Sequence, residues 1–186
     1  MKVIDVIASA LRLIGRSELI PFIEDASNAY EEDAGEVIET LLYCFNAVED
    51  ELARKYVPLV ICEEMSSPDN KYYFSKFKCN PIKIKKVTAD GKTVPFKIFV
   101  GYMQAQANKI EVEYEFAPMP KPIDGFSDFL DEVGEYLIAL GMASEYSIIN
   151  GEAEMADRWE KKYRAQLDAV QRKLPVCAGI PPRRWV

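Results

Sequence analysis

The hydrophobic pattern of this chain changes period twice, and that change constrains the fold more than any other feature. Apolar residues recur every three or four positions up to residue 56, alternate with polar residues over 59–117, and return to the first spacing after 124. Helices repeat an apolar face about every 3.6 residues and strands every two. The sequence therefore predicts an α+β fold, in which a small antiparallel β domain is inserted into a helical bundle of about four helices.

The predicted domains follow these changes of period. Residues 1–57 and 124–175 are assigned to the helical domain, 58–123 to the β insert, and 176–186 to an extended C-terminal tail that contains two prolines and a glycine and follows Pro175. No apolar run approaches the roughly 20 residues needed to cross a bilayer, so no membrane segment is expected.

Two helices are predicted before the β insert. The first covers residues 3–14 and ends at Gly15, which suits the left-handed position after a helix. The second covers about 34–56, where Asp33 and Glu36 resemble a capping box. The stretch between these helices includes Pro21 and has no sustained period, which favours a connecting loop with short turns.

Two long helices are predicted after the insert. Ser127 is expected to be the N-cap of the first, with acidic residues in its first turns. The turn residues Asn150 and Gly151 then lead into an amphipathic helix that ends near Lys173. Together these helices form a predicted αα-hairpin.

Four to six short strands are predicted in the insert. Asp90-Gly91 is a strong signal for a two-residue hairpin turn, and the last strand alternates apolar residues with glutamates. The predicted strands cover 59–62, 71–74, 84–87, 94–98 and 110–116.

The residue types offer little for catalysis. The sequence contains no histidine, the commonest general base and metal ligand, and no phosphate loop or nucleophile elbow. The acidic groups at 31–33 and 49–51 are interpreted as solvated helix ends, although an enzyme that works through carboxylates alone is the alternative. No catalytic residue, metal ligand or cofactor is predicted. Four widely spaced cysteines are interpreted as buried free thiols: Cys44, Cys62, Cys79 and Cys177.

The charge is unevenly distributed along the chain. Residues 57–123 hold 10 Lys and Arg against 7 Asp and Glu, whereas residues 1–56 hold 5 against 12. Lys83, Lys85 and Lys86 are candidates for contact with phosphate, and the nearby aromatic residues 72–74 and 77 could stack on bases. The alternative is an ordinary half-buried strand with a solvated lysine face.

Two further stretches suggest contacts with other molecules. Gly134, Gly141 and Ser144 are small for a helix interior, which permits close packing within the chain or between subunits. The C-terminal tail joins a stiff backbone to two cations and a large aromatic residue, types that often dominate binding interfaces. Its candidate partner-binding residues are Pro182, Arg183, Arg184 and Trp185.

The order of helices, β insert, αα-hairpin and tail resembles that of the head-to-tail adaptor (connector) proteins of tailed bacteriophages, including the tail tubular adaptor proteins of podoviruses. The resemblance covers most of the chain. It is most evident at Ala143-Ser144-Glu145-Tyr146 through Asn150-Gly151-Glu152, at Trp159-Glu160-Lys161-Lys162-Tyr163 and at Pro182-Arg183-Arg184-Trp185.

This resemblance implies a structural virion protein of the neck or tail, assembled in the host cytoplasm. It would form a homo-oligomeric ring, commonly of twelve copies, which docks under the portal protein and surrounds the channel for double-stranded DNA. By analogy, the β insert would face a tail or nozzle protein, and the C-terminal tail would reach the portal or a neighbouring subunit. The alternative is a monomeric interaction module, or one that binds nucleic acid non-specifically through the basic β insert.

Overall fold

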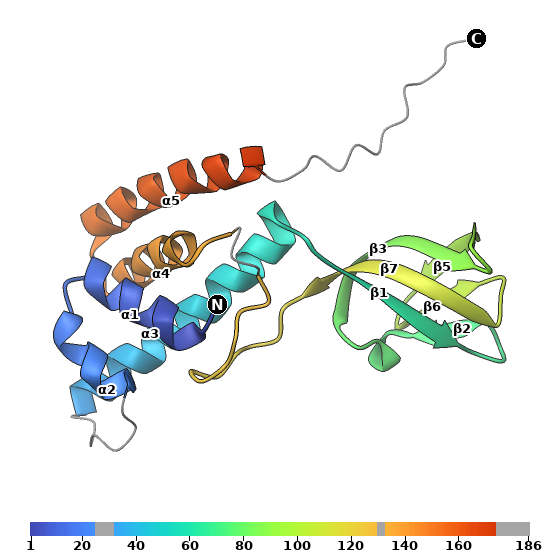
Figure 1. The fold of residues 1–186 in the computed structure, drawn as a ribbon, viewed down its shortest axis with the longest axis horizontal. Helices are drawn as coiled ribbons and strands as arrows, with labels where there is room; N and C mark the ends of the chain where they lie inside the picture. Colours follow the sequence, from blue (N-terminus) through green and yellow to red (C-terminus); the bar gives the residue numbers. More distant parts are fainter. Residues whose placement is uncertain (25–31, 130–132, 174–186) are drawn as a thin grey trace, which may run out of the picture.

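The computed structural model describes residues 1–24, 32–129 and 133–173. Within them the chain forms five α-helices and two antiparallel sheets, an α+β fold (Figure 1). The helices are α1 (Val3–Leu13), α2 (Ile20–Glu24), α3 (Glu32–Glu51), α4 (Glu135–Ile149) and α5 (Ala153–Lys173). The strands are β1 (Leu59–Ser66), β2 (Lys71–Tyr73), β3 (Asn80–Ala89), β4 (Lys92–Thr93), β5 (Phe96–Phe99), β6 (Tyr102–Ala105) and β7 (Lys109–Ala117).

The first helix ends as predicted. Gly15 follows the C-cap of α1 with a φ of +77°, a left-handed conformation that glycine adopts without a steric penalty. The loop predicted after it is partly wrong, because a 3₁₀ turn (Ser17–Leu19) leads directly into α2. Pro21 is the second residue of α2, and the first turn of a helix tolerates proline.

The long helix α3 begins at Glu32, two residues before the start at residue 34 that the predicted capping box requires. Asp33 lies inside α3, so its assignment as a cap is wrong. The helix continues into one turn of π-helix (Leu52–Tyr56), and the Val57 N–H donates to the Leu52 carbonyl at 2.7 Å. Pro58 follows and cannot extend this pattern, because proline has no N–H.

The prediction that the third long helix begins at Ser127 is wrong. The helix α4 begins at Glu135, since Gly134 before it has φ +81° and ψ 135°, outside the helical region. Ser127 instead accepts a hydrogen bond from the Phe129 N–H at 3.1 Å, which forms a local turn. The predicted turn between α4 and α5 is confirmed, with Gly151 at φ +74°.

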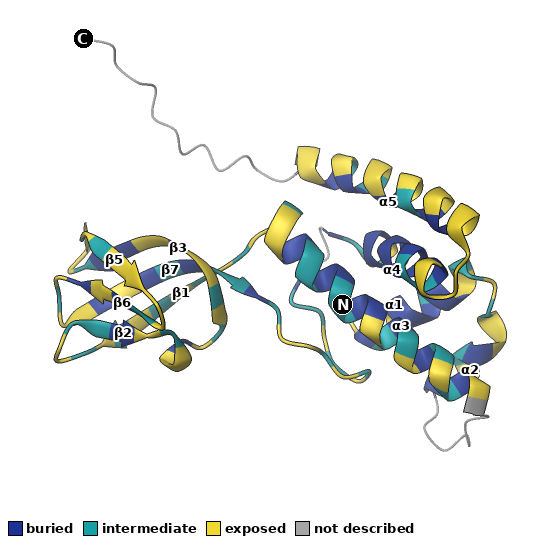
Figure 2. Ribbon diagram, turned by 180° about the vertical axis from the view of Figure 1, so that it is seen from behind, coloured by how far each residue is buried: buried dark blue, intermediate teal, exposed yellow. Residues whose placement is uncertain are grey.

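The helix α4 lies at the centre of the helical part. Every residue from Leu137 to Ser144 is buried, and α4 packs against α1, α3 and α5 (Figure 2). A helical segment that is buried around its whole circumference needs no polar face, which explains why residues 137–144 contain no charged side chain.

The seven strands within the described residues exceed the four to six that were predicted. They form one sheet in the order β1-β7-β3-β4 and another in the order β2-β6-β5. The predicted alternation along β7 is confirmed for Ile110, Val112 and Tyr114, which are buried. Two strands were missed in the sequence: the two-residue β4, and β6, which follows β5 after a turn at Gly101.

The predicted hairpin turn at Asp90-Gly91 is confirmed, but the strand predicted at 94–98 is not its second strand, because the two-residue β4 pairs with β3 instead. Both residues have positive φ, 50° and 74°, as a type I′ turn requires. The ladder with β3 ends where the Val94 N–H donates to the Val87 carbonyl at 3.0 Å. Pro95 cannot donate the next hydrogen bond, and the following strand, β5, joins the second sheet.

Two hydrophobic cores hold these elements. Residues from both ends of the chain form the first core, which joins α1, α3, α4 and α5 and includes Leu11, Phe45 and Leu137. The second core lies between the two sheets and includes Met103 and Tyr114. No helix in the described parts of the chain combines the length and apolar character that a bilayer crossing demands.

Candidate interaction surfaces

The structure places Lys83, Lys85 and Lys86 on β3, where all three are exposed. Their neighbours on β7 are acidic, because Lys83 pairs in register with Glu115 and Lys86 with Glu113. The ammonium group of Lys85 also lies 3.5 Å from a carboxylate oxygen of Glu115. This face of the first sheet therefore carries both charges, and the three lysines do not form a continuous cationic track for phosphate.

A second exposed face, on the β2-β6-β5 sheet, gathers three aromatic side chains. The register places Tyr73 and Phe99 on either side of Tyr102. The rings of Phe99 and Tyr102 stack with centroids 5.0 Å apart and planes at 14°, and the rings of Tyr73 and Tyr102 are 5.8 Å apart. We call Tyr73, Phe99 and Tyr102 the aromatic face; Lys71 lies over the Tyr102 ring at 5.8 Å.

Sequence reasoning could not identify this face. It grouped residue 73 with Tyr72 and Phe77, which the structure buries between the sheets. Alternation along β2 places Tyr72 inside and Tyr73 outside, but only the pairing of β2 with β6 brings Tyr73 beside Tyr102.

The turn between β5 and β6 extends the aromatic face with exposed apolar side chains. Val100 is fully exposed at 101%, and Ile98 and Phe99 are exposed at 58% and 41%. The Phe74 N–H donates to the Gly101 carbonyl at 3.0 Å, which holds this turn. The β5–β6 turn (residues 98–101) is therefore apolar. Lys97 directly precedes it, and residues 91–110 contain lysines but no aspartate or glutamate, so the surroundings of the turn are cationic.

The helical part has a surface of the opposite character. A hollow of about 340 Å³ lies between α3 and the end of α4, and we call it the helical groove. Its apolar walls include Ile149, which is 52% exposed. Arg16 lines the groove but is paired with Glu18 at 2.6 Å, so Asp33 and Glu36 give it a net negative charge.

The small residues of α4 pack inside the chain. A Cβ atom at Gly141 would lie 2.9 Å from Val48 on α3 and 3.1 Å from Tyr163 on α5. Ser144 is 3% exposed and donates a hydrogen bond to the Ala156 carbonyl at 3.3 Å. These contacts are internal, which leaves Gly141 and Ser144 unavailable to a second subunit, and Gly134 forms the N-terminal cap of α4.

One carboxylate that was interpreted as solvated is buried. Glu49 on α3 is 1% exposed and accepts a hydrogen bond from the Ser127 hydroxyl, while its second oxygen has no partner. Burial raises the pKa of Glu49, and the nearby Asp128 raises it further. Among the described residues, no group of three or more His, Cys, Asp or Glu side chains is arranged to hold a metal ion.

The cysteines differ from the predicted uniform burial. Cys44 is buried, whereas Cys62 is exposed on β1 and Cys79 is half-buried; Cys177 lies outside the described residues. Burial raises the pKa of Cys44 to about 12, and partial desolvation on the sheet surface and the Glu111 carboxylate raise the pKa of Cys62. Both thiols are therefore protonated at neutral pH, which makes them weak nucleophiles.

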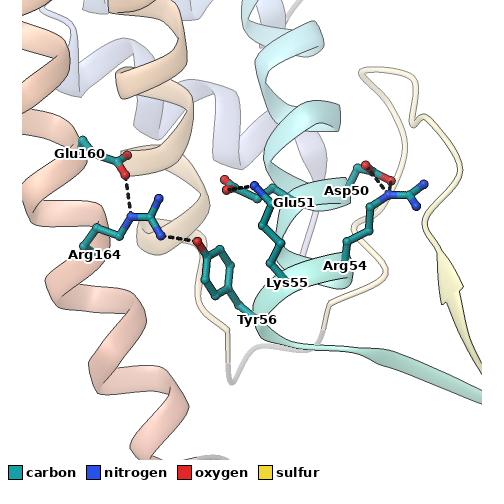
Figure 3. A network of polar contacts seen from close by, with 7 residues as sticks. All are labelled: Asp50, Glu51, Arg54, Lys55, Tyr56, Glu160 and Arg164. Carbon is teal, nitrogen blue, oxygen red and sulfur yellow. Dashed lines mark hydrogen bonds and ion pairs between the residues drawn. The ribbon is translucent and has the colours of Figure 1, made fainter. Parts of the chain in front are cut away.

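Polar contacts fasten the junction where the chain leaves the helices (Figure 3). Arg164 on α5 is paired with Glu160 at 2.6 Å and donates a hydrogen bond to the Tyr56 hydroxyl on the π-turn before β1. Its guanidinium group also lies 5.4 Å from the centre of the Tyr56 ring. This contact ties α5 to the segment that enters the first sheet.

Asn46 on α3 holds the segment in which the chain returns from β7 to the helices. Its amide oxygen accepts from the Lys121 N–H at 2.6 Å, and its amide nitrogen donates to the Lys121 carbonyl at 3.2 Å. One side chain on α3 thus satisfies both backbone groups of a residue in the proline-rich return segment.

Asn46→Ala is expected to lower the free energy of unfolding by about 1 kcal/mol, because it removes both hydrogen bonds to the return segment. Urea denaturation measures this loss, and hydrogen exchange should show faster exchange at the Lys121 amide. Glu39→Ala, on the exposed side of α3, is the matched control and should change neither measurement. Unchanged exchange at Lys121 in Asn46→Ala would contradict this role.

The tail residues Pro182, Arg183, Arg184 and Trp185 lie outside the described residues. In comparisons with known proteins, no protein-family model matches the sequence, and no curated protein matches it significantly.

Proposed function

We propose that this protein is a head-to-tail adaptor of a tailed bacteriophage. In this proposal it forms a ring beneath the portal, around the DNA channel, and provides the surface to which the tail attaches. The strands act as a domain inserted into a helical bundle, so that each part of the subunit contacts a different neighbour.

The observation that carries this proposal is the contrast between the exposed surfaces of the two parts. The β5–β6 turn and the aromatic face are apolar and lie beside lysines, whereas the helical groove is apolar and acidic. Exposed apolar side chains that cluster on a surface usually mark a contact with another molecule. A subunit with two such dissimilar surfaces is suited to a position between different components of an assembly.

The charge of the helical part also supports a DNA channel. Residues 1–56 have an excess of seven acidic over basic residues, 12 against 5. Like charges repel phosphate, so an acidic wall lets DNA slide without binding it.

A nucleic-acid-binding module is the second candidate function. It is favoured by the aromatic face, because aromatic rings beside lysines can stack on bases while the lysines contact phosphate. Binding of single-stranded oligonucleotides that weakens steeply with salt and is lost in Tyr102→Ala would favour this module over the adaptor.

The adaptor is tested by mixing the full chain with the portal ring encoded in the same genome, followed by sedimentation. We expect the wild-type chain to co-sediment with the portal as a ring. Deletion of residues 180–186 should weaken this binding about tenfold or more, since it removes Arg183, Arg184 and Trp185.

The same deletion should change the melting temperature by no more than about 2 °C. Arg172→Ala, an exposed arginine near the end of α5, is the control and should bind the portal like the wild type. A wild-type chain that never co-sediments with the portal would refute the adaptor. A large loss of thermal stability on deletion would show instead that the tail belongs to the core.

A further inference from the structure

We propose that the β5–β6 turn of one copy docks into the helical groove of a second copy. This inference deepens the proposed ring and rests on it for its biological role, but its chemistry depends only on the two surfaces described above.

The β5–β6 turn has the properties of an interface anchor. Phe99 and Val100 project apolar side chains, and the stack of Phe99 on Tyr102 holds the base of the turn in place. Rigid apolar anchors lose little conformational entropy on binding, which favours their use at interfaces. Lys97 on the same strand adds a positive charge, which no acidic residue within 91–110 offsets.

The helical groove complements this anchor in both shape and charge. It is hollowed, it exposes Ile149 as an apolar wall, and Asp33 and Glu36 on α3 line its edge. An apolar anchor that carries a lysine therefore finds apolar contact and opposite charge at one place. Complementary charge of this kind orients two partners before contact.

A single copy cannot form this contact with itself. The groove lies where α3 begins and α4 ends, at the end of the helical part far from the strands, whereas the turn lies on the strands (Figure 1). The two surfaces are different patches of one chain, so the contact is head-to-tail. Such contacts close into rings or extend as filaments.

A second copy fits the turn better than nucleic acid does. Lys71 already lies over the Tyr102 ring and Lys76 over the Tyr73 ring at 5.9 Å, and Phe99 stacks on Tyr102, so few ring faces are open to bases. The fully exposed Val100 has no polar group to offer a phosphate backbone, but an apolar groove would bury it.

Sedimentation velocity of the full chain over a concentration series at low salt tests this contact. We expect the wild type to form species larger than a monomer, and we expect Val100→Asp and Ile149→Asp each to remain monomeric. Both side chains are largely exposed, so neither change should disturb the fold, and circular dichroism checks this. An equimolar mixture of the two variants should form dimers and nothing larger. The intact turn of Ile149→Asp can enter the intact groove of Val100→Asp, and the two surfaces left over both carry a substitution.

A charge exchange tests the polar part of the contact. Lys97→Glu and Glu36→Lys should each weaken association about tenfold, and the double variant should recover most of this loss. A double variant that is weaker than either single variant would show that these two charges do not meet.

The outcomes separate this contact from the adaptor function. If Val100→Asp and Ile149→Asp still form full rings on the portal, the proposed contact is wrong and the adaptor stands. If the wild type assembles through the contact but never binds the portal, the contact stands and the adaptor is wrong. A wild-type chain that stays monomeric at every concentration, alone and on the portal, overturns the contact.

Discussion

Gly141→Ala is expected to lower the free energy of unfolding by about 2 kcal/mol, although alanine favours a helix over glycine by about 1 kcal/mol. The new Cβ would lie 2.9 and 3.0 Å from the two methyl groups of Val48 and 3.1 Å from the Tyr163 ring. Neither neighbour can yield easily, since a β-branched side chain on a helix has essentially one rotamer and Tyr163 is 1% exposed. Overpacking therefore outweighs the gain in helix propensity.

The double variant Gly141→Ala/Val48→Ala identifies the clash as the cause. Removing the Val48 methyl groups opens the space that the new Cβ needs, so the double variant should be more stable than the sum of the single changes by about 1 kcal/mol. Urea denaturation of all variants measures this coupling. Ile148→Ala, at a 58% exposed position on the same helix, should change stability by less than about 0.5 kcal/mol. If Gly141→Ala alone stabilises the protein, the close approach of α3 and α5 to α4 is incorrect.

Elements with a long, regular period could be predicted from the sequence. The strand β7 alternates along its length and the helix α5 repeats its apolar residues at three- and four-residue steps, so local pattern and tertiary burial agree. The turns at Gly15, Asp90-Gly91 and Gly151 were also predictable, because few residue types tolerate positive φ.

The start of α4 was not predictable from periodicity. The apolar spacing continues through Phe129 and Val133, both of which are buried in the first core, but they reach it from non-helical backbone. The N-terminus of the chain accounts for part of this: the Val3 N–H donates to the Gly125 carbonyl and the Ser127 N–H to the Met1 carbonyl. Such pairing between distant segments leaves no signal in either segment alone.

The candidate surfaces were partly predictable. The excess of lysine in residues 57–123 could be counted, but strand register decides which lysines face glutamates, as Lys83 and Lys86 do. The aromatic face and the helical groove each combine residues from elements far apart in the sequence, so only the assembled fold brings them together.

Glu49→Gln is expected to stabilise the protein at neutral pH by about 1 to 2 kcal/mol. Glu49 is buried, and one of its two oxygens has no hydrogen-bond partner, so its ionised form is poorly solvated. Glutamine keeps an oxygen that can accept the hydrogen bond from Ser127, and it carries no charge. The replacement therefore removes a desolvation cost while it preserves the shape of the site.

The pH dependence distinguishes this cause from a general change in packing. Burial raises the pKa of Glu49, so the folded protein holds this proton more tightly than the unfolded chain does. The contribution of Glu49 to wild-type stability should then fall as pH rises from about 4.3, the ordinary glutamate pKa, through the raised pKa of the folded state. Below this window the stabilities of the wild type and Glu49→Gln should converge, and above it their difference should become constant. Glu39→Gln, at an exposed position on the same helix, is the control and should follow the wild-type curve. If the difference in stability between Glu49→Gln and the wild type does not vary with pH, burial of the Glu49 charge is not the cause of that difference.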